Sequence, residues 1–244
     1  MTAILFGSIG TLADTSELQR QAFNEAFATH GLDWEWGRDE YLALLEKSGG
    51  SNRVTEYAAA HGQEVDADAV HETKSELFQK SLAETQLAAR PGVVDTIQQA
   101  RGKGVQVALV TTTTPENVSA LLTALSPNVR AGDFDLVVDL TQVAASKPNK
   151  AAYDFAVDRL GVGVEDCLAI EDNLGGVEAA VAAGIRCVAF PNENTARHDF
   201  GAADGTVDRL SFSRLAEYVP AADPDIAPPP PGPQRPSGWP LRPT

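Results

Sequence analysis

Polar and charged residues suited to phosphate chemistry follow several apolar runs in the second half of the sequence. Thr111-Thr112 and Glu171-Asp172 each come directly after a run that predicts a strand, and Lys147-Pro148 precedes an amphipathic segment. A threonine hydroxyl, a lysine ammonium and N–H groups at helix starts suit a phosphate oxyanion, and a carboxylate pair is the expected ligand of Mg²⁺. Each signal alone is weak, but together, in this order and at strand ends, they indicate an anion-binding site.

The amino-terminal stretch should contribute another loop to the same edge of the sheet, but it offers no reactive group. The run Ala3–Phe6 predicts a buried parallel strand, and Gly7–Thr11 is expected to form the loop at its carboxyl end. In an open parallel sheet, ligands bind at this end of the strands. None of residues 7–12 is ionisable.

Helix and strand signals alternate from Arg90 onward. Short, β-rich apolar runs predict strands at 105–110, 134–138, 167–170 and 186–190, with helices between them. Runs of this kind are short enough to be buried on both faces, and alternation with helices is typical of parallel sheets. The fold class is therefore α/β, a Rossmann-like, doubly wound parallel sheet.

Residues 16–87 carry helical patterns with no strand between them. They predict a helical insertion after the first strand, which can fold over a binding loop as a lid. The expected domains are a core of 1–13 plus 88–218, a helical cap domain of 14–87, and a tail of 219–244. The proline run 228–231 cannot form helix interiors or ladders, so we expect a disordered tail, either solvated or docking on a protein partner.

Composition limits the partners. The formal net charge of −15 disfavours unassisted binding to nucleic acid or an anionic membrane, and no apolar run reaches the roughly 20 residues of a spanning helix. Cys167 and Cys187 lie in apolar runs without metal-ligand spacing, which favours reduced thiols in a cytoplasmic core. We expect a cytoplasmic, monomeric protein that binds a small metabolite.

The chain resembles the haloacid dehalogenase superfamily, in its capped phosphatase branch of phosphoglycolate phosphatases, β-phosphoglucomutases and CbbY-type sugar-bisphosphate phosphatases. The resemblance covers Met1 to about Tyr218. The stretches that carry it are Gly10–Thr15, Ser48–Gly50, Arg90–Gly92, Thr111–Val118, Lys147-Pro148 and Glu171–Asn173 with the Gly-Val-Glu-Ala-Ala helix behind it.

This resemblance implies roles for individual residues. Gly10, Thr11, Thr111, Thr112 and Lys147 would bind phosphate. Glu171 and Asp172 would hold Mg²⁺, and Gly49, Gly50 and Arg53 would form the cap loop that contacts the far end of the substrate. A lysine that the family carries near Ser51 is missing, and Gln19 stands where many relatives carry a histidine.

The first motif departs from the family pattern. Family members carry one aspartate that attacks phosphorus and ligates Mg²⁺ and a second that shuttles a proton; the corresponding positions are Gly7 and Ile9. Glycine offers no nucleophile, and losing a proton shuttle usually forgoes roughly 10²- to 10⁴-fold in rate. Mg²⁺ binding is expected to be weak or absent. Ser8, Asp14 and Asp139 are poor substitutes for the nucleophile.

Two functions therefore compete. The protein is either a non-catalytic descendant that binds a phosphorylated sugar or phosphate, or a Mg²⁺-dependent phosphosugar phosphatase with a non-standard nucleophile or an activated water. The missing aspartates favour the first.

Overall fold

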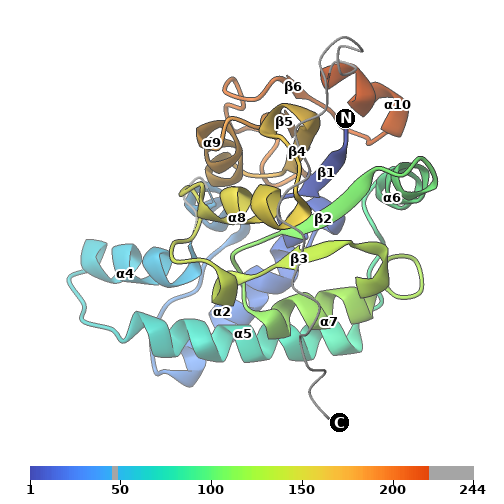
Figure 1. Cartoon of the computed structure of the whole chain (residues 1–244). Coiled ribbons are helices and arrows are strands. Elements are labelled where there is room, and N and C mark those ends of the chain that lie inside the picture. The colour runs from blue at the N-terminus through green and yellow to red at the C-terminus, as the bar shows by residue number, and fades with distance from the viewer. Residues whose placement is uncertain (46–48, 220–244) are drawn as a thin grey trace, which may run out of the picture.

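A parallel sheet organises the chain in the computed structural model, which describes residues 1–45 and 49–219 (Figure 1). Its six strands follow the order β3-β2-β1-β4-β5-β6, and every neighbouring pair is parallel. The strands are β1 (Ala3–Phe6), β2 (Gln106–Val110), β3 (Leu136–Val138), β4 (Cys167–Glu171), β5 (Arg186–Ala189) and β6 (Gly205–Thr206). The doubly wound α/β fold predicted from the alternation is confirmed.

The first strand lies at the centre of the sheet. Phe6, the last residue of β1, pairs with Leu109 of β2 and with Ile170 of β4, so the three carboxyl ends coincide. All of β1 is buried, as expected for a central strand covered on both faces. The residues that follow these strands are thereby brought to one edge.

Helices cover both faces of the sheet. Side chains of Ile4, Phe6 and their neighbours on one face pack against α6 (Val93–Gly102), α7 (Pro115–Leu125) and α10 (Phe212–Leu215). Side chains of Ala3 and Leu5 on the other face pack against α8 (Ala151–Leu160) and α9 (Leu174–Ala182). Short 3₁₀ turns occupy Ala131–Asp133, Leu140–Gln142, Val164–Asp166 and Ala216–Tyr218.

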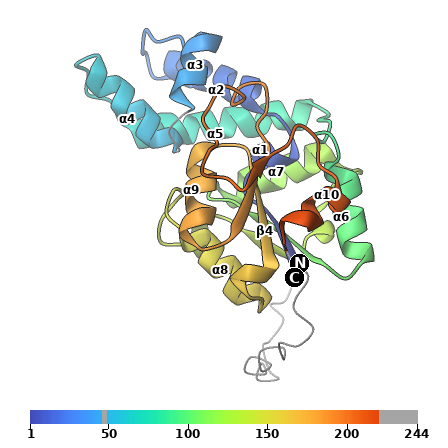
Figure 2. The same cartoon turned by 90° about the horizontal axis from the view of Figure 1, so that it is seen from above.

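Four further helices follow the first strand and lie together beyond the carboxyl edge of the sheet (Figure 2). They are α2 (Ser16–Thr29), α3 (Arg38–Leu44), α4 (Gly50–Ala60) and α5 (Ala67–Glu84), called the inserted helices below. A separate aromatic cluster around Phe23, Phe27 and Trp36 fills their interior. Gln79 of α5 donates to Asn117 of α7 at 3.0 Å, which joins the inserted helices to the rest.

The structure differs from the sequence-based expectations in local detail. Residues Ile9–Leu12 form one helical turn, α1, inside the stretch expected to be a loop, because the Ser8 hydroxyl accepts from the Thr11 N–H at 3.2 Å. The two-residue strand β6 was not expected. Helix α4 begins at Gly50, so Gly50 and Arg53, which the resemblance placed in a cap loop, belong to a helix. The predicted tail falls almost wholly outside the described residues.

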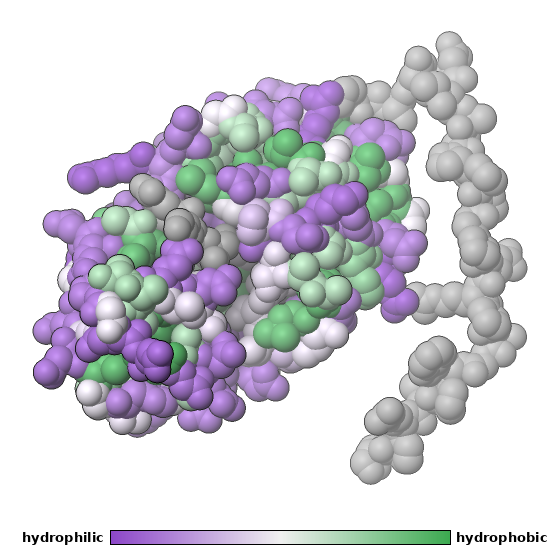
Figure 3. Space-filling view, turned by 90° about the vertical axis from the view of Figure 1, so that its left-hand side faces the viewer, coloured by the Kyte–Doolittle hydropathy of each residue, from purple (hydrophilic) through white to green (hydrophobic). Residues whose placement is uncertain are grey.

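The surface carries no large apolar patch on the face that Figure 3 shows, where hydrophilic residues separate small hydrophobic groups. No helix within residues 1–45 and 49–219 is both long and apolar enough to cross a membrane.

Candidate anion-binding site

A cavity of about 270 Å³ lies between the carboxyl edge of the sheet and the inserted helices. Loops after the strands form one wall, and α2 to α5 form the other. The core wall consists of Gly7–Gly10, Thr111–Thr114, Asn117, Leu140, Ser146, Lys147, Asp172, Asn173, Asn192 and Thr195; the opposite wall consists of Thr15, Ser16, Gln19, Phe23, Tyr41, Leu45, Gly49, Gly50, Arg53, His71 and Lys74.

Most residues expected from the sequence to form a site meet in this cavity. Gly10, Thr111, Thr112, Lys147 and Asp172 lie on the core wall, and Gly49, Gly50 and Arg53 lie on the opposite wall. Two expected residues are turned away from it. The Thr11 hydroxyl donates to the Ser8 carbonyl at 2.6 Å, and Glu171 is fully buried beneath the wall.

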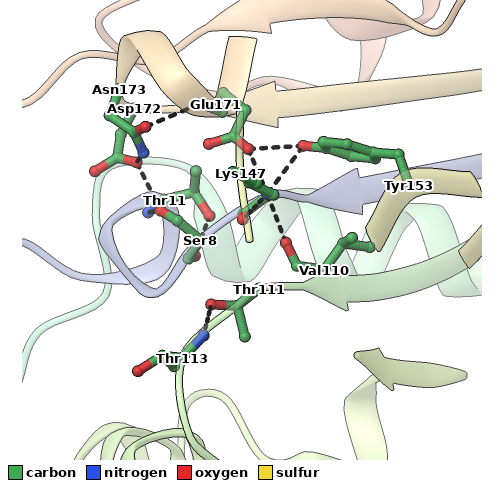
Figure 4. Close-up of polar contacts among 12 residues, drawn as sticks. Ser8, Thr11, Val110, Thr111, Thr113, Lys147, Tyr153, Glu171, Asp172 and Asn173 are labelled. Atoms are coloured by element: carbon green, nitrogen blue, oxygen red, sulfur yellow. Dashed lines mark hydrogen bonds and ion pairs between the residues drawn. The ribbon is translucent and has the colours of Figure 1, made fainter. Parts of the chain in front are cut away.

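Lys147 is held by acceptors of the protein itself (Figure 4). Its ammonium donates to the Val110 carbonyl at 2.7 Å, to the Gly7 carbonyl, and to Glu171 Oε1 at 2.6 Å. The Tyr153 hydroxyl donates to the same Glu171 oxygen at 2.8 Å. Burial raises the pKa of Glu171, while the nearby Lys147 ammonium acts in the opposite direction. The lysine and the carboxylate therefore form a buried ion pair.

The Glu171 carboxylate lies in a space kept open by two glycines. A Cβ atom at Gly7 would overlap Glu171 Oε1 and the Tyr153 hydroxyl, and a Cβ at Gly176 would overlap the same carboxylate. Glu171 Oε2 has no hydrogen-bond partner among the residues described. The absence of a side chain at Gly7 is thus what allows Glu171 to turn inward toward Lys147.

Asp172 is the carboxylate that remains on the cavity wall. Its Oδ1 accepts from the Ser8 hydroxyl at 2.6 Å and from Asn173 Nδ2 at 3.0 Å (Figure 4). A Cβ at Gly10 would overlap its Oδ2. The β1–α1 turn is therefore shaped around this carboxylate.

Thr111 directly follows the last residue of β2 and is buried. Its backbone N–H donates to Val138 at 3.0 Å, and its hydroxyl accepts from the Thr113 N–H at 3.3 Å. Thr114 caps α7 by accepting from the Asn117 N–H at 3.2 Å, with Pro115 at the first helical position. The threonine run thus turns the chain from strand to helix along the cavity wall.

The carboxylates weighed as substitute nucleophiles act as local caps. Asp139 accepts from the Thr141 N–H at 2.8 Å, and Asp14 accepts from the Ser16 N–H at 3.0 Å. Neither lines the cavity. Both were expected to be poor substitutes for the nucleophile, and their hydrogen bonds are those of local caps.

Positive charge gathers on the wall made by the inserted helices. Lys74 is 4% exposed, and its ammonium donates to Gln19 Oε1 at 3.0 Å and lies 4.9 Å from the ring centres of Phe23 and Phe78. Burial lowers its pKa to about 7. The Arg53 guanidinium lies nearby, and its Nε donates to the Leu44 carbonyl at 2.8 Å.

His71 completes this wall as a neutral group. Burial, with Lys74 and Arg53 nearby, lowers its pKa to about 4. The ring lies against Gly50, where a Cβ would overlap His71 Nε2. The sequence analysis missed Lys74 and His71; both lie on α5 among charged residues that look solvated, and only the packing of α5 against α2 turns them inward.

Arg90 is a second buried cation to which the sequence analysis assigned no role. Its guanidinium donates to the carbonyls of Gly10, Phe190 and Pro191 at 2.7 to 3.0 Å and lies 3.5 Å from the Phe190 ring centre. It ties the β1–α1 turn to the segment after β5. Its contribution is structural support of the cavity.

The residues present do not fit a Mg²⁺ ion. Glu171 faces Lys147 beneath the wall, so among the described residues Asp172 is the one carboxylate on the cavity surface, and two donors already occupy its Oδ1. Within residues 1–45 and 49–219, no group of three His, Cys, Asp or Glu side chains is arranged to hold a metal. Mg²⁺ demands near-ideal octahedral oxygen ligands, which this set does not provide.

Comparison with known proteins decides the family. The model of haloacid dehalogenase-like hydrolases matches residues 1–184. The chain belongs to the haloacid dehalogenase-like hydrolase family. Protein CbbY of Cereibacter sphaeroides is 40% identical over 219 residues, which cover 87% of this chain and 93% of the relative. The plasmid-encoded Protein CbbY of Cupriavidus necator is 39% identical over 232 residues, covering 91% of each.

Solved structures of this hydrolase family agree with the fold. CbbY from Rhodobacter sphaeroides in complex with phosphate matches with a TM-score of 0.80 at 38% identity, covering 90% of this chain and 99% of the other. A mutant of that CbbY in complex with xylulose-(1,5)bisphosphate matches equally well. The resemblance to CbbY-type members of the family is thereby confirmed.

Proposed function

We propose that this protein binds a small phosphorylated sugar in the cavity and does not form the aspartyl-phosphate of the hydrolytic family members. Gly7 and Ile9 stand where the resemblance puts the attacking and proton-transferring aspartates. The inserted helices act as the cap that closes over the ligand. The substrate class is inferred from the CbbY relatives, one of which is known with phosphate and with a sugar bisphosphate.

One observation carries the proposal. The space that a side chain at Gly7 would need is filled by the Glu171 carboxylate, which pairs with Lys147. A nucleophile cannot be supplied from Gly7, and Glu171 is held beneath the wall with its charge balanced. The groups that could bind sugar hydroxyls and an anion remain exposed to the cavity.

Two measurements test the proposal. We expect no Mg²⁺-dependent hydrolysis of p-nitrophenyl phosphate or of a panel of phosphorylated sugars, together with measurable calorimetric binding of at least one panel member. Turnover well above background that disappears in Lys147→Ala would contradict it.

A specific contact supports a second candidate, a hydrolase whose nucleophile is Ser8, the residue that the sequence analysis had ranked as a poor substitute. The Ser8 hydroxyl lies on the cavity wall and donates to Asp172, which could accept its proton. If the purified protein shows turnover, Ser8→Ala should abolish it, whereas Ser146→Ala, a change to another serine on the same wall, should not. Turnover that survives Ser8→Ala would exclude this candidate.

A further inference from the structure

Lys74 is a buried amine that the proposed function does not use. Its side chain comes from α5, is 4% exposed and lines the cavity. The side-chain nitrogen, Nζ, donates to Gln19 Oε1 at 3.0 Å and lies 4.9 Å from the ring centres of both Phe23 and Phe78. The protein thus surrounds Nζ with one amide oxygen and two aromatic faces, and the cavity is the approach to it.

No carboxylate balances a charge on this nitrogen. Lys74 has no acidic side chain within ion-pair distance in the described part of the chain. The helices with the most contacts to α5 are α2, α7 and α4. The charged or titratable groups that act on Lys74 are Arg53 from α4, which has Glu56 near it, and the neutral His71 from α5, which has Asp68 near it. Among the described residues, α2 and α7 add no charged group there.

These surroundings favour the uncharged form of the amine. The attraction of the ring faces for an ammonium offsets only part of the cost of removing that ammonium from water. The like charge of Arg53 opposes the ammonium as well. Burial accordingly lowers the pKa of Lys74 to about 7, so a large fraction of this side chain carries a free lone pair near neutral pH.

We propose that Lys74 Nζ is a nucleophile that forms an imine with a small hydroxylated aldehyde held in the cavity. The Nζ lone pair adds to the carbonyl carbon, and the carbonyl oxygen takes up a proton to give a carbinolamine. The carbon–oxygen bond then breaks, and the oxygen leaves as water with the two protons that Nζ has lost. The reaction is reversible and needs no oxidant or reductant.

The cavity limits which carbonyl compounds can reach Lys74. Its volume of about 270 Å³ admits only a small molecule, and polar residues such as Ser8 and Asn173 on the core wall suit hydroxyl groups. An aldehyde has one substituent on its carbonyl carbon, so it meets less hindrance beside Phe23 than a ketone does. His71 lies three residues before Lys74 in α5 and lines the same cavity, and its neutral ring can take up and return a proton during the addition.

Reductive trapping tests the proposal. The full-length protein is treated at pH 7.5 with D-glyceraldehyde and sodium cyanoborohydride, which reduces an imine to a stable secondary amine. Site-resolved mass spectrometry then gives the rate of modification at each lysine. We expect Lys74 to react about tenfold faster than Lys80, an exposed lysine of the same helix, because the neutral amine is the reactive form. A Lys74 rate no higher than that of Lys80 would overturn the proposal.

Two further readouts show whether the fold causes this reactivity. In guanidinium chloride the rates at Lys74 and Lys80 should become equal. In the folded protein the ratio of the two rates should fall about tenfold per pH unit between pH 8 and 10, because Lys80 gains neutral amine there and Lys74 already has it. A ratio that does not change with pH would contradict the proposal.

A carboxylate placed beside Lys74 gives a matched test. Gln19→Glu keeps the shape of the side chain and supplies a counter-ion for the ammonium, so the rate at Lys74 should fall about tenfold at pH 7.5. Gln21→Glu makes the same change of charge at an exposed position of α2 and should leave the rate nearly unchanged. Circular dichroism confirms that both variants are folded. Equal rates in the two variants would overturn the proposal.

This inference goes beyond the proposed function, because it concerns the carbonyl group of a ligand and the probe carries no phosphate. Binding of a phosphorylated sugar without trapping of glyceraldehyde at Lys74 would overturn the inference and leave the proposed function standing. Trapping at Lys74 without binding of any phosphorylated sugar would support the inference and contradict the proposed function.

Discussion

Lys74 is a buried cation whose protonation opposes folding when no anion is present. Its pKa is lowered from 10.5 to about 7 by burial, so the unfolded chain holds more protons than the folded chain between these values. The free energy of unfolding should therefore rise with pH across this window, by at most about 1.4 kcal/mol per pH unit. Urea denaturation of the ligand-free protein at pH 7.5 and 8.5, extrapolated to zero urea, gives the free energy of unfolding at each pH.

The control for this prediction is Lys74→Met, which keeps the apolar stem and cannot titrate. Its stability should vary less between the two pH values than that of the unchanged protein. Equal pH dependence in both proteins would show that Lys74 is not the group responsible. The same reasoning predicts that binding of an anion raises the pKa of Lys74 and takes up a proton.

Glu171 balances the charge of the buried Lys147 ammonium. Removing the Glu171 side chain should therefore destabilise the protein more than replacing its carboxylate with a neutral amide. Glu171→Ala leaves the lysine without a counter-ion and should lower the free energy of unfolding by about 3–5 kcal/mol. Glu171→Gln preserves the size and an acceptor oxygen and should cost clearly less. Chemical denaturation of both variants gives the comparison; an equal loss would mean that packing, not charge, dominates at this position.

The sequence was sufficient to predict that many of the site residues meet, but not which way their side chains point. Thr111 and Asp172 follow strands whose carboxyl ends must coincide in a parallel sheet, and Lys147 precedes α8, so their meeting was predictable. The inward turn of Glu171 was not, because it depends on the space left by Gly7 and Gly176. Lys74 gave no signal, since its burial arises from the packing of α2 on α5.

At the scale of elements, the β1–α1 turn and the end of β4 fit together in shape, because the Glu171 carboxylate fills the space beside Gly7. The double change Gly7→Asp with Ile9→Asp would put back both aspartates of the family pattern and should restore hydrolysis under one structural condition. A side chain at Gly7 overlaps Glu171 and Tyr153, so Glu171 must rotate out toward the cavity. There it would join the new aspartates and Asp172 around a cation.

The double variant should therefore become dependent on Mg²⁺ for stability as well as for activity. We expect a lower melting temperature than that of the unchanged protein in chelator, and recovery of several degrees on adding Mg²⁺, because the ion offsets the repulsion between carboxylates. Differential scanning calorimetry with and without Mg²⁺ measures this. A folded variant that gains neither stability nor turnover from Mg²⁺ would show that the surrounding site no longer supports the metal.

Element boundaries were predictable where apolar periodicity is strong. β1 has the predicted bounds, and β2 differs by one residue, because both are continuous buried runs. β6 and α1 were missed for a physical reason: with two and four residues, neither is long enough to create a period. The turn α1 is set by the Ser8 cap and by the Arg90 contact to Gly10, which joins residues distant in sequence.

At the scale of the whole molecule, the cavity lies where two interiors meet. The sheet core and the aromatic cluster of the inserted helices are separate hydrophobic clusters, with the cavity between them. Its ligand would touch both, so binding should stabilise the inserted helices against the sheet.

The net charge of −15 gives the last prediction. Repulsion among excess carboxylates opposes the compact state and is screened by salt, so the melting temperature should rise by a few degrees between about 20 and 200 mM NaCl. MgCl₂ and CaCl₂ at equal concentration should produce equal shifts, because without a built metal site both ions act through general screening. A larger shift with Mg²⁺ that is lost in Asp172→Asn would instead reveal specific binding at the core wall and contradict the metal-free site.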